Sequence, residues 1–290
     1  MTRRALALSG GGARIHYHAG VLSHLLGTLR REYQIVTGVS AGAIVAAHIA
    51  QYPIGQESFA AESLDALTRS IQAKNVYERW PFGFLQGALK KSFYSSAPLR
   101  KTLSDVLSED AIRKSGRALR IGAVCAETGE FQIFTEKTKG ILAAVLASSA
   151  FPGVLEPVEI QGSLWMDGGV RVMTPIGAAI EAGATEVDVV LTTPKDYEAP
   201  EGARSLRALG IAVRAIDFMV AEIVEKDLKL ANYTNLLVLN GVKKNKKVVR
   251  LNVIRPTKDL GDSFNFSYGN SVFMRAVGRT DAVSQINPAT

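Results

Sequence analysis

The chain has 290 residues, of which 47% are hydrophobic, so it is long enough to bury a large core and close to the upper limit for one domain. Its net charge of +7 favours an anionic partner, such as phospholipid headgroups, nucleic acid or acidic solutes, and charge alone does not choose among them. No apolar run reaches the roughly 20 residues of a membrane span, and the apolar start at residues 5–8 is shorter than the core of a secretory signal, about 7–15 residues. A single cysteine, Cys125, cannot form an internal disulfide. These features predict a protein that resides in a reducing compartment and is soluble or at most peripheral to a membrane.

Short apolar strands alternate with longer helices along the chain, which predicts a mostly parallel sheet with helices packed on it. The first half is expected to contain, in order, a strand at 4–8, a loop at 9–14, a helix at 17–31, a strand at 34–37 and helices at 41–50, 57–73 and 98–107. The second half is expected to contain strands at 119–126 and 131–135 around a hairpin turn, a helix at 140–147, strands at 155–160 and 163–166, a helix from 174 to 183, a strand at 185–191 and helices at 204–230 and 272–283.

The C-terminal part contains the densest basic cluster, at residues 243–247, between the apolar stretches 236–239 and 248–254. This pattern predicts a solvated hairpin turn. We therefore expect one α/β domain over residues 1–290, with the core motifs at 5–183 and C-terminal helices and a hairpin at 184–290.

A candidate nucleophile, Ser40, lies between a predicted strand and a predicted helix. The residues Gly38-Val39-Ser40-Ala41-Gly42 fit the pattern G-x-S-x-G. A tight turn from strand to helix needs small flanking residues so that the serine projects, and the helix N-terminus favours developing negative charge. The alternative is an ordinary glycine-rich helix entry, so the assignment depends on a partner elsewhere in the chain.

A glycine-rich loop follows the first predicted strand. In Ser9-Gly10-Gly11-Gly12-Ala13-Arg14, successive glycines let backbone N–H groups turn outward toward an anion. In an esterase that anion is the tetrahedral oxyanion, and one lost donor costs ~2.7–4 kcal/mol of barrier stabilisation. The competing dinucleotide-binding pattern G-x-G-x-x-G fails at Ile15. We interpret Arg14 as orienting the loop by bonding backbone carbonyls, with an ordinary surface arginine as the alternative.

The candidate base is Asp167, which ends a predicted strand and precedes two glycines. A bare Asp-Gly pair is usually a turn, but a serine nucleophile needs a base, and the four histidines all lie within the first 48 residues. His48 is on the same predicted helix as Ser40, about 12 Å further along its axis, and cannot be the partner. The serine, acid, histidine order of α/β-hydrolases is therefore unavailable to this chain.

The other histidines, His16, His18 and His24, precede the nucleophile and are interpreted as partly buried packing residues. His16 and His18 are two positions apart and do not share a helix face. No zinc-type spacing occurs elsewhere, and the calcium-loop pattern D-x-D-x-D-G is absent. We therefore predict no metal site.

Taken together, Gly10-Gly11-Gly12-Ala13-Arg14, Gly38-x-Ser40-x-Gly42 and Asp167-Gly168-Gly169 resemble, in order and spacing, the patatin-like phospholipase family. A fourth element, Ala147-Ser148-Ser149-Ala150-Phe151-Pro152, resembles the family's A-S-x-A-x-P segment, which shapes the loop before the catalytic aspartate. The resemblance covers roughly residues 5–183. There is one departure: family members usually carry glycine after the arginine, where this chain has Ile15, and this position bears on the geometry of the glycine loop.

The resemblance implies a three-layer α/β/α sandwich and a lipid acyl hydrolase, a phospholipase A-type serine esterase that uses a dyad rather than a triad. The site residues it implies are the catalytic pair Ser40 and Asp167, the oxyanion loop of Gly10, Gly11, Gly12 and Arg14, and the elbow glycines Gly38 and Gly42. An unshifted aspartate has a pKa of about 3.9, too low for an effective base at neutral pH unless burial raises it, so we predict a dry pocket around Asp167. No metal or organic cofactor is required.

The expected substrate is a phospholipid or another acyl ester, met by peripheral contact with an anionic membrane surface in the cytoplasm. Residues 80–94 interleave aromatic side chains with Lys90 and Lys91, which suits a lid or a headgroup interface; the alternative is a cover for the core between two helices. No nucleic acid partner is expected, because no recognition motif accompanies the charge. Two other functions stay open: acyl transfer to an alcohol or thiol through the same acyl-enzyme, and a catalytically silent lipid-binding protein. The motifs give no oligomeric state.

Overall fold

A mixed sheet of eight strands, most of them parallel, organises the residues that the structure describes, which are 2–81, 90–195, 208–243 and 247–286 of a computed structural model. The strand order is β10-β9-β1-β2-β5-β8-β7, and β6 pairs with β5 beside this path. The strands are β1 (Arg4–Leu8), β2 (Ile35–Gly38), β5 (Ala118–Cys125), β6 (Phe131–Thr135), β7 (Val158–Ile160), β8 (Ser163–Asp167), β9 (Glu186–Val190) and β10 (Arg250–Ile254). A separate antiparallel pair consists of β3 (Glu78–Arg79) and β4 (Tyr94–Ser95).

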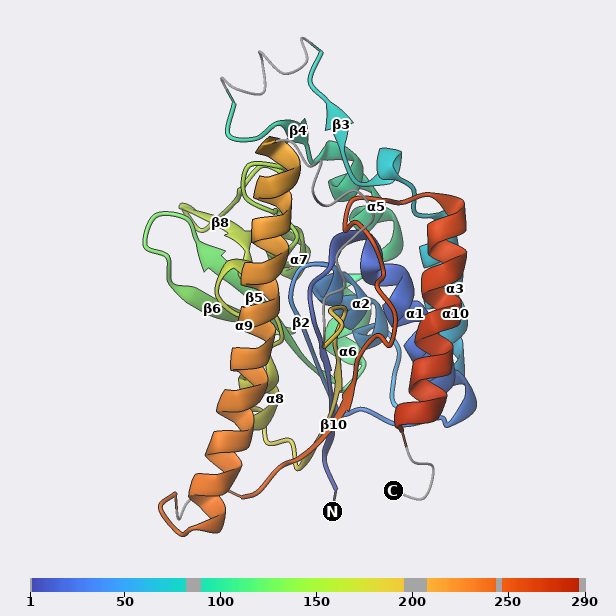
Figure 1. Ribbon diagram of the computed structural model, residues 1–290, viewed down its shortest axis with the longest axis vertical. Helices are drawn as coiled ribbons and strands as arrows, with labels where there is room; N and C mark the ends of the chain where they lie inside the picture. Colours follow the sequence, from blue (N-terminus) through green and yellow to red (C-terminus); the bar gives the residue numbers. More distant parts are fainter. Residues whose placement is uncertain (1, 82–89, 196–207, 244–246, 287–290) are drawn as a thin grey trace.

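Helices cover both faces of this sheet. One layer contains α8 (Ile176–Glu181) and the long α9 (Ala208–Leu239), and Figure 1 shows α9 in orange on the opposite side of the sheet from α10 in red. The other layer contains α1 (Ile15–Leu22), α2 (Ala41–Ala50), α3 (Glu57–Ser70), α5 (Ala97–Val106), α6 (Glu109–Lys114), α7 (Ile141–Ser148) and α10 (Tyr268–Gln285). The architecture is the expected three-layer α/β/α sandwich. None of the described helices combines the length and the apolarity that crossing a bilayer requires.

The first strand shows why the sheet is buried on both faces. Successive side chains of a strand point to opposite faces, so Ala5 and Ala7 pack into the core shared with α8 and α9, whereas Leu6 and Leu8 pack into the core shared with α1 and α2. A strand that is apolar at every position is typical of a parallel sheet covered by helices on both sides.

Most of the expected elements are confirmed, including the strand at 4–8 and the helix at 41–50. The helix after the glycine loop begins at Ile15 rather than at residue 17, and a π-helical segment, Ser23–Thr28, continues it. The helix expected from residue 174 begins at Ile176, because Pro175 lies outside helical geometry before it. The short helix α6 has no counterpart among the predicted elements.

The predicted hairpin around residues 243–247 is wrong. α9 continues to Leu239, so the apolar residues 236–239 form its last turn instead of a strand. β10 pairs with β9 in parallel, with Arg250 opposite Glu186, and a parallel pair needs a long crossover, which α9 supplies. The basic cluster therefore connects a helix to a strand; of its members, residues 244–246 lie outside the described residues.

The strands β2 and β8 both pair with β5 and end facing each other. β2 runs parallel to β5 and ends with Gly38 opposite Ile121, whereas β8 runs antiparallel to β5 and ends with Asp167 opposite Ala123. The two strand ends are thus two residues of β5 apart, about 7 Å. This arrangement brings the turn after β2 and the last residue of β8 to one point of the sheet.

Candidate active site

Ser40 occupies the turn between β2 and α2 in a strained backbone conformation. Its φ of 56° and ψ of −128° lie in a region that few non-glycine residues adopt. A Cβ on Gly38 would collide with the carbonyl group of Gly42. A Cβ on Gly42 would collide with the carbonyl groups of Leu8 and Ser9. Both glycines are therefore required by close backbone contacts, and the turn has the geometry that lets a serine project from the end of a strand.

Asp167 ends β8 with its side chain almost completely buried, at 1% exposure. Its Oδ1 accepts a hydrogen bond from the N–H of Gly169 at 2.8 Å, whereas Oδ2 is buried without a hydrogen-bond partner among the described residues. Burial raises the pKa of Asp167 to about 7, and the Ser40 hydroxyl and the Gly169 N–H oppose this rise. The Ser40 hydroxyl thus lies close enough to the Asp167 carboxyl group to affect its pKa. In free enzymes such contacts often tighten only when substrate binds. The burial expected for this aspartate is therefore observed.

The Ala-Ser-Ser-Ala-Phe-Pro segment at the end of α7 holds both members of this pair. The hydroxyl oxygen of Ser148 accepts a hydrogen bond from the N–H of Ser40 at 3.0 Å and donates one to a carbonyl of β5 at 2.6 Å. The hydroxyl of Ser149 donates to the carbonyl of Ser40 at 3.3 Å, and the carbonyl of Ala150 accepts from the N–H of Asp167 at 3.0 Å. From the sequence, this segment was expected to shape the loop before the aspartate, but its contact with Ser40 was not predicted. The hydrogen bond between Ser148 and Ser40 joins residues 108 positions apart, which no local pattern reveals.

The glycine loop between β1 and α1 presents two unpaired N–H groups to the same region. The N–H of Gly10 donates to the carbonyl of Met173 at 3.1 Å, and the carbonyl of Gly10 accepts from the Thr192 hydroxyl. The N–H groups of Gly11 and Gly12 have no hydrogen-bond partner in the described part of the chain. The N–H of Gly10 is therefore already hydrogen-bonded within the protein, which corrects its predicted role as an oxyanion donor. Gly11 and Gly12 are the candidate oxyanion donors.

Arg14 ends the loop, and its guanidinium group bonds to the backbone. Its Nε and Nη2 donate to the carbonyl of Gly261 at 3.2 and 2.9 Å, and Nη2 lies 3.8 Å from a carboxylate oxygen of Asp217. The N–H of Ala13 donates to the carbonyl of Ser263 at 2.7 Å. Arg14 therefore bonds to a backbone carbonyl, as interpreted from the sequence, and this contact occupies its Nε and Nη2 groups. The stretch before α10, which sequence reasoning did not single out, holds the loop from outside.

Ile15 and the histidines pack beneath the glycine loop. Ile15 is the first residue of α1 and is 2% exposed, so the departure from the family pattern is accommodated in the core. His16 and His18 are fully rather than partly buried, whereas His24 is partly buried, as expected. Burial lowers the pKa values of His16, His18 and His48 to about 4, 3 and 4. They are uncharged at neutral pH. No group of three or more potential metal-binding side chains gathers among the described residues.

A cavity of about 310 Å³ borders both Ser40 and Asp167. Its wall is mostly apolar and is drawn from distant parts of the chain, namely Phe93, Phe151, Val154, Met173, Ile216, Val220 and Phe264. Apolar cavities with a few convergent polar groups are the usual form of a small-molecule site. This cavity is suited to an acyl chain whose carbonyl group meets the serine.

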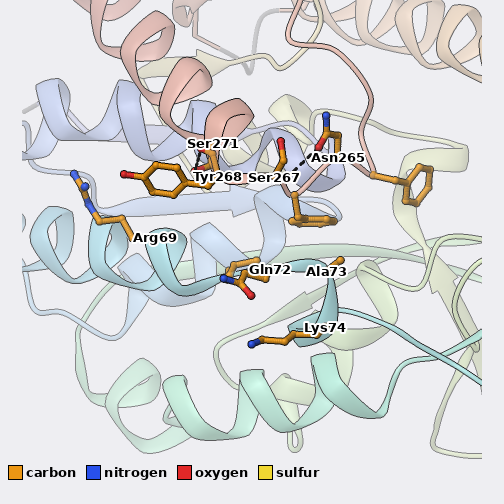
Figure 2. Close-up of a pocket in the computed structure, with 11 residues that line it drawn as sticks. Arg69, Gln72, Ala73, Lys74, Asn265, Ser267, Tyr268 and Ser271 are labelled. Atoms are coloured by element: carbon orange, nitrogen blue, oxygen red, sulfur yellow. Dashed lines mark hydrogen bonds between the residues drawn. The ribbon is translucent and has the colours of Figure 1, made fainter.

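A larger cavity, of about 500 Å³, lies between the end of α3 and the start of α10 and contains neither residue of the pair (Figure 2). No described carboxylate lines it. Its two serine hydroxyls serve α10 itself: Ser267 Oγ accepts from the N–H of Asn270, and Ser271 Oγ donates to the carbonyl of Tyr268. The larger cavity therefore offers no nucleophile with a base, and the smaller one is the candidate active site.

Comparisons with known proteins identify what the region around this cavity is similar to. The family model for patatin-like phospholipase matches residues 6–180. Patatin-like phospholipase domain-containing proteins of Aspergillus oryzae and Chaetomium globosum are each 31% identical over 201 residues, which is 61% of this chain but 27% and 23% of theirs. The match thus spans about a quarter of the length of these relatives. The crystal structure of VipD from Legionella pneumophila matches 98% of this chain and 66% of that chain, with a TM-score of 0.47 and 15% identity.

Proposed function

The chain belongs to the patatin-like phospholipase family, and from this premise we propose that it hydrolyses fatty acyl esters of lipids, as a phospholipase A-type esterase with Ser40 as nucleophile and Asp167 as base. One observation carries the proposal. Ser40, Oδ2 of Asp167 and the N–H groups of Gly11 and Gly12 border a single apolar cavity, and neither Oδ2 nor these N–H groups have a hydrogen-bond partner among the described residues. A nucleophile, a base and oxyanion donors around an apolar pocket are the parts that acyl transfer requires.

In the first half of the reaction, Oδ2 of Asp167 takes the hydroxyl proton of Ser40 while Oγ attacks the carbonyl carbon of the ester. The N–H groups of Gly11 and Gly12 bind the oxyanion that forms. When this intermediate collapses, the bond to the alcohol oxygen breaks, and the leaving alcohol takes the proton back from Asp167. An acyl-enzyme on Ser40 remains.

In the second half, a water molecule gives its proton to Asp167 and its oxygen adds to the acyl carbonyl carbon. Collapse of the second intermediate breaks the bond to Ser40 Oγ, which regains the proton, and the fatty acid leaves. A base works best when its pKa lies near the working pH, and the raised pKa of Asp167, about 7, meets this condition.

The test is fatty-acid release from mixed phospholipid vesicles by wild type, Ser40→Ala and Asp167→Asn, with a soluble short-chain ester assayed in parallel. Ser263→Ala is the matched control, because Ser263 lines the same cavity and lies outside the proposed chemistry. We expect release by wild type and by the control, and a loss of at least about a thousandfold in the two dyad variants.

Other outcomes would replace the proposal. Equal release by all four proteins contradicts the dyad. Inactivity of all four with intact folding favours a silent lipid-binding protein. Ester formation that appears only when an alcohol or thiol acceptor is added favours an acyltransferase that uses the same acyl-enzyme.

We also propose that the protein meets its substrate by peripheral contact with an anionic membrane surface on the cytoplasmic side. The net charge of +7 favours such a surface. The first part of α9 supports the contact, because Ile216 and Val220 line the catalytic cavity while Ile211 and Met219 expose 58% and 65% of their surface. Phe93 both lines the cavity and is 43% exposed, which supports the interface interpretation for the end of segment 80–94; residues 82–89 lie outside the described residues.

Cosedimentation with vesicles of phosphatidylglycerol and phosphatidylcholine tests this contact. We expect Met219→Asp to lower the bound fraction several-fold, whereas Leu239→Asp, an exposed position at the other end of α9, leaves it unchanged. Turnover of the soluble ester should stay the same in both variants. Equal binding by wild type and Met219→Asp would show that this end of α9 does not meet the membrane.

A further inference from the structure

Asp227 of α9 binds the loop that follows the catalytic aspartate. Its Oδ2 accepts hydrogen bonds from two consecutive backbone N–H groups, those of Met173 at 3.0 Å and Thr174 at 2.9 Å. Bonds from N–H groups to an ionised carboxylate are stronger than bonds between neutral groups. One carboxylate on α9 therefore sets the conformation of this loop.

Met173 passes this constraint on to the glycine loop. Its carbonyl accepts the N–H of Gly10, and its side chain lines the catalytic cavity. A Cβ on either Gly10 or Gly169 would meet the end of the Met173 side chain, so Met173 is tightly packed between the glycine loop and the turn after Asp167. A shift of Met173 displaces the loop that carries the candidate oxyanion donors.

The carboxyl group of Asp227 also responds to the pH of the solution. A cavity of about 490 Å³ between α8 and α9 borders it, so protons reach it from outside the catalytic cavity. Among the described residues, Glu181 of α8 and Lys243 beyond α9 line the same cavity as Asp227, and Lys226 of its own helix acts on its charge. Burial raises the pKa of Asp227 to about 6, against the opposing effects of the two N–H groups and of Lys226.

We propose that Asp227 is a positioning residue for acyl transfer, which holds Met173 and, through it, the glycine loop in the geometry that binds the oxyanion. The inference rests on the proposed esterase activity. Asp227 does not border the cavity that contains Ser40, so its effect is indirect. Because the oxyanion exists only beyond the ground state, loss of this support lowers kcat and leaves KM nearly unchanged.

The experiment compares wild type, Asp227→Ala and Asp227→Asn on the soluble short-chain ester, with Glu222→Gln, an exposed carboxylate on the same helix, as the matched control. We expect kcat of Asp227→Ala to fall about ten- to a hundredfold with KM within about twofold. Asp227→Asn keeps an acceptor oxygen without the charge and is expected to retain more activity than the alanine variant. Glu222→Gln is expected to behave as wild type.

The pH profile separates this role from a merely structural one. In wild type, two carboxyl groups lose their charge as the pH falls, so log(kcat/KM) drops with a slope above one below about pH 6. In Asp227→Asn only Asp167 titrates, and the slope returns to one. Unchanged kcat in the alanine variant, or identical profiles for wild type and Asp227→Asn, would overturn the inference.

Two further readouts keep the result decisive. If Asp227→Ala does not fold, as judged by its melting curve, the Asp227→Asn profile alone decides. Labelling of Ser40 by a fluorophosphonate, followed by mass spectrometry, reports on the proposed function independently of ester turnover. A wild type that is neither labelled nor active overturns the proposed esterase and this inference together, whereas an active wild type with unaffected Asp227 variants overturns this inference alone.

Discussion

The wall of the candidate catalytic cavity includes Ser40, which precedes α2, and residues of α9, and these two helices differ in almost every physical respect. All ten residues of α2 are buried, and the helix begins at the strained residue Ser40. α9 is 32 residues long and exposes large apolar side chains along its length, among them Leu230 and Leu236 at 63% and 54%. In Figure 1, α2 lies inside the molecule, whereas α9 runs along its outside.

This difference shows which part of the chain contains the candidate nucleophile and base and which part shapes the cavity. The family match ends at residue 180, so it includes α2 and the end of β8 but not α9. The candidate nucleophile and base lie where the backbone is held from several sides. α9 supplies wall residues and, through Asp227, one point of attachment to the loop after Asp167. We therefore expect changes at the catalytic edge to act on the reaction, and changes on the outer face of α9 to have little effect.

The largest effect is expected at Asp167. Its folded-state pKa, about 7, lies well above the ordinary value of an aspartate, so the folded protein binds the proton more tightly than the unfolded chain does. The stability that this group contributes is present below about pH 4 and is lost as the pH rises toward 7. Asp167→Asn should abolish turnover and yet, above pH 7, exceed wild type in free energy of unfolding by a few kcal/mol, on the order set by the shift.

Denaturant unfolding of both proteins at pH 5 and pH 8 measures this gain, which should be larger at pH 8. In wild type, kcat/KM should fall about tenfold per pH unit between pH 7 and 6 and at least as steeply below, because a protonated Asp167 cannot accept the proton of Ser40. A wild-type kcat/KM that is constant from pH 5 to 8, or an asparagine variant less stable than wild type at pH 8, would contradict the assignment of Asp167 as a base buried away from water.

A smaller but still large effect is expected at the start of α2. Gly42→Ala places a methyl group against the carbonyls that end β1 and should lower kcat/KM about a hundredfold and the free energy of unfolding by about 1–3 kcal/mol. Gly177→Ala in α8 is the matched control, because a Cβ there meets nothing within 4 Å, and it should stabilise the protein by about 0.5–1 kcal/mol. Kinetics on the soluble ester and denaturant unfolding give both quantities. Similar behaviour of the two variants would mean that α2 is not held as tightly as its contacts indicate.

An intermediate effect is expected at Ser148. Ser148→Ala removes the acceptor of the partly buried Ser40 N–H and the donor to a buried carbonyl of β5. We expect a loss of about 1–3 kcal/mol in stability and of about tenfold in kcat/KM. Ser149→Ala should be milder, since its hydroxyl has a second acceptor in Val145 and its bond to Ser40 is longer, at 3.3 Å. A larger loss of stability or of kcat/KM in Ser149→Ala than in Ser148→Ala would contradict this expectation.

The smallest effect is expected on the outer face of α9. Leu236→Gln replaces a side chain that is 54% exposed and distant from the cavity wall at Ile216 and Val220. Stability should change by no more than about 0.5 kcal/mol, and kcat/KM on the soluble ester should stay the same. A tenfold change in kcat/KM would show that the far end of the helix is coupled to the site, and the contrast between the two helices would then be incorrect.

Much of the fold could be predicted from local sequence patterns, and the wrong prediction of a hairpin has a physical cause. The strand at 4–8 and the helix at 41–50 follow from short-range apolar patterns and turn residues. The false hairpin at 243–247 arose because a lysine-rich connection looks the same whether the next strand pairs antiparallel with its predecessor or parallel with β9. Pairing partners are chosen by packing across the whole sheet, which a local pattern does not contain.

The same division applies to the site. The sequence by itself determined the candidate nucleophile Ser40, the candidate base Asp167 and the glycine loop, because each requires particular residue types at adjacent positions: small residues around a tight turn, glycines where N–H groups turn outward, and an acid at a strand end. Only the tertiary structure decided which N–H groups of the loop are unpaired and which residues hold the site, among them Ser148 and Asp227. Those roles depend on hydrogen bonds between residues far apart in the chain, and such bonds are made only when the sheet brings its strand ends together.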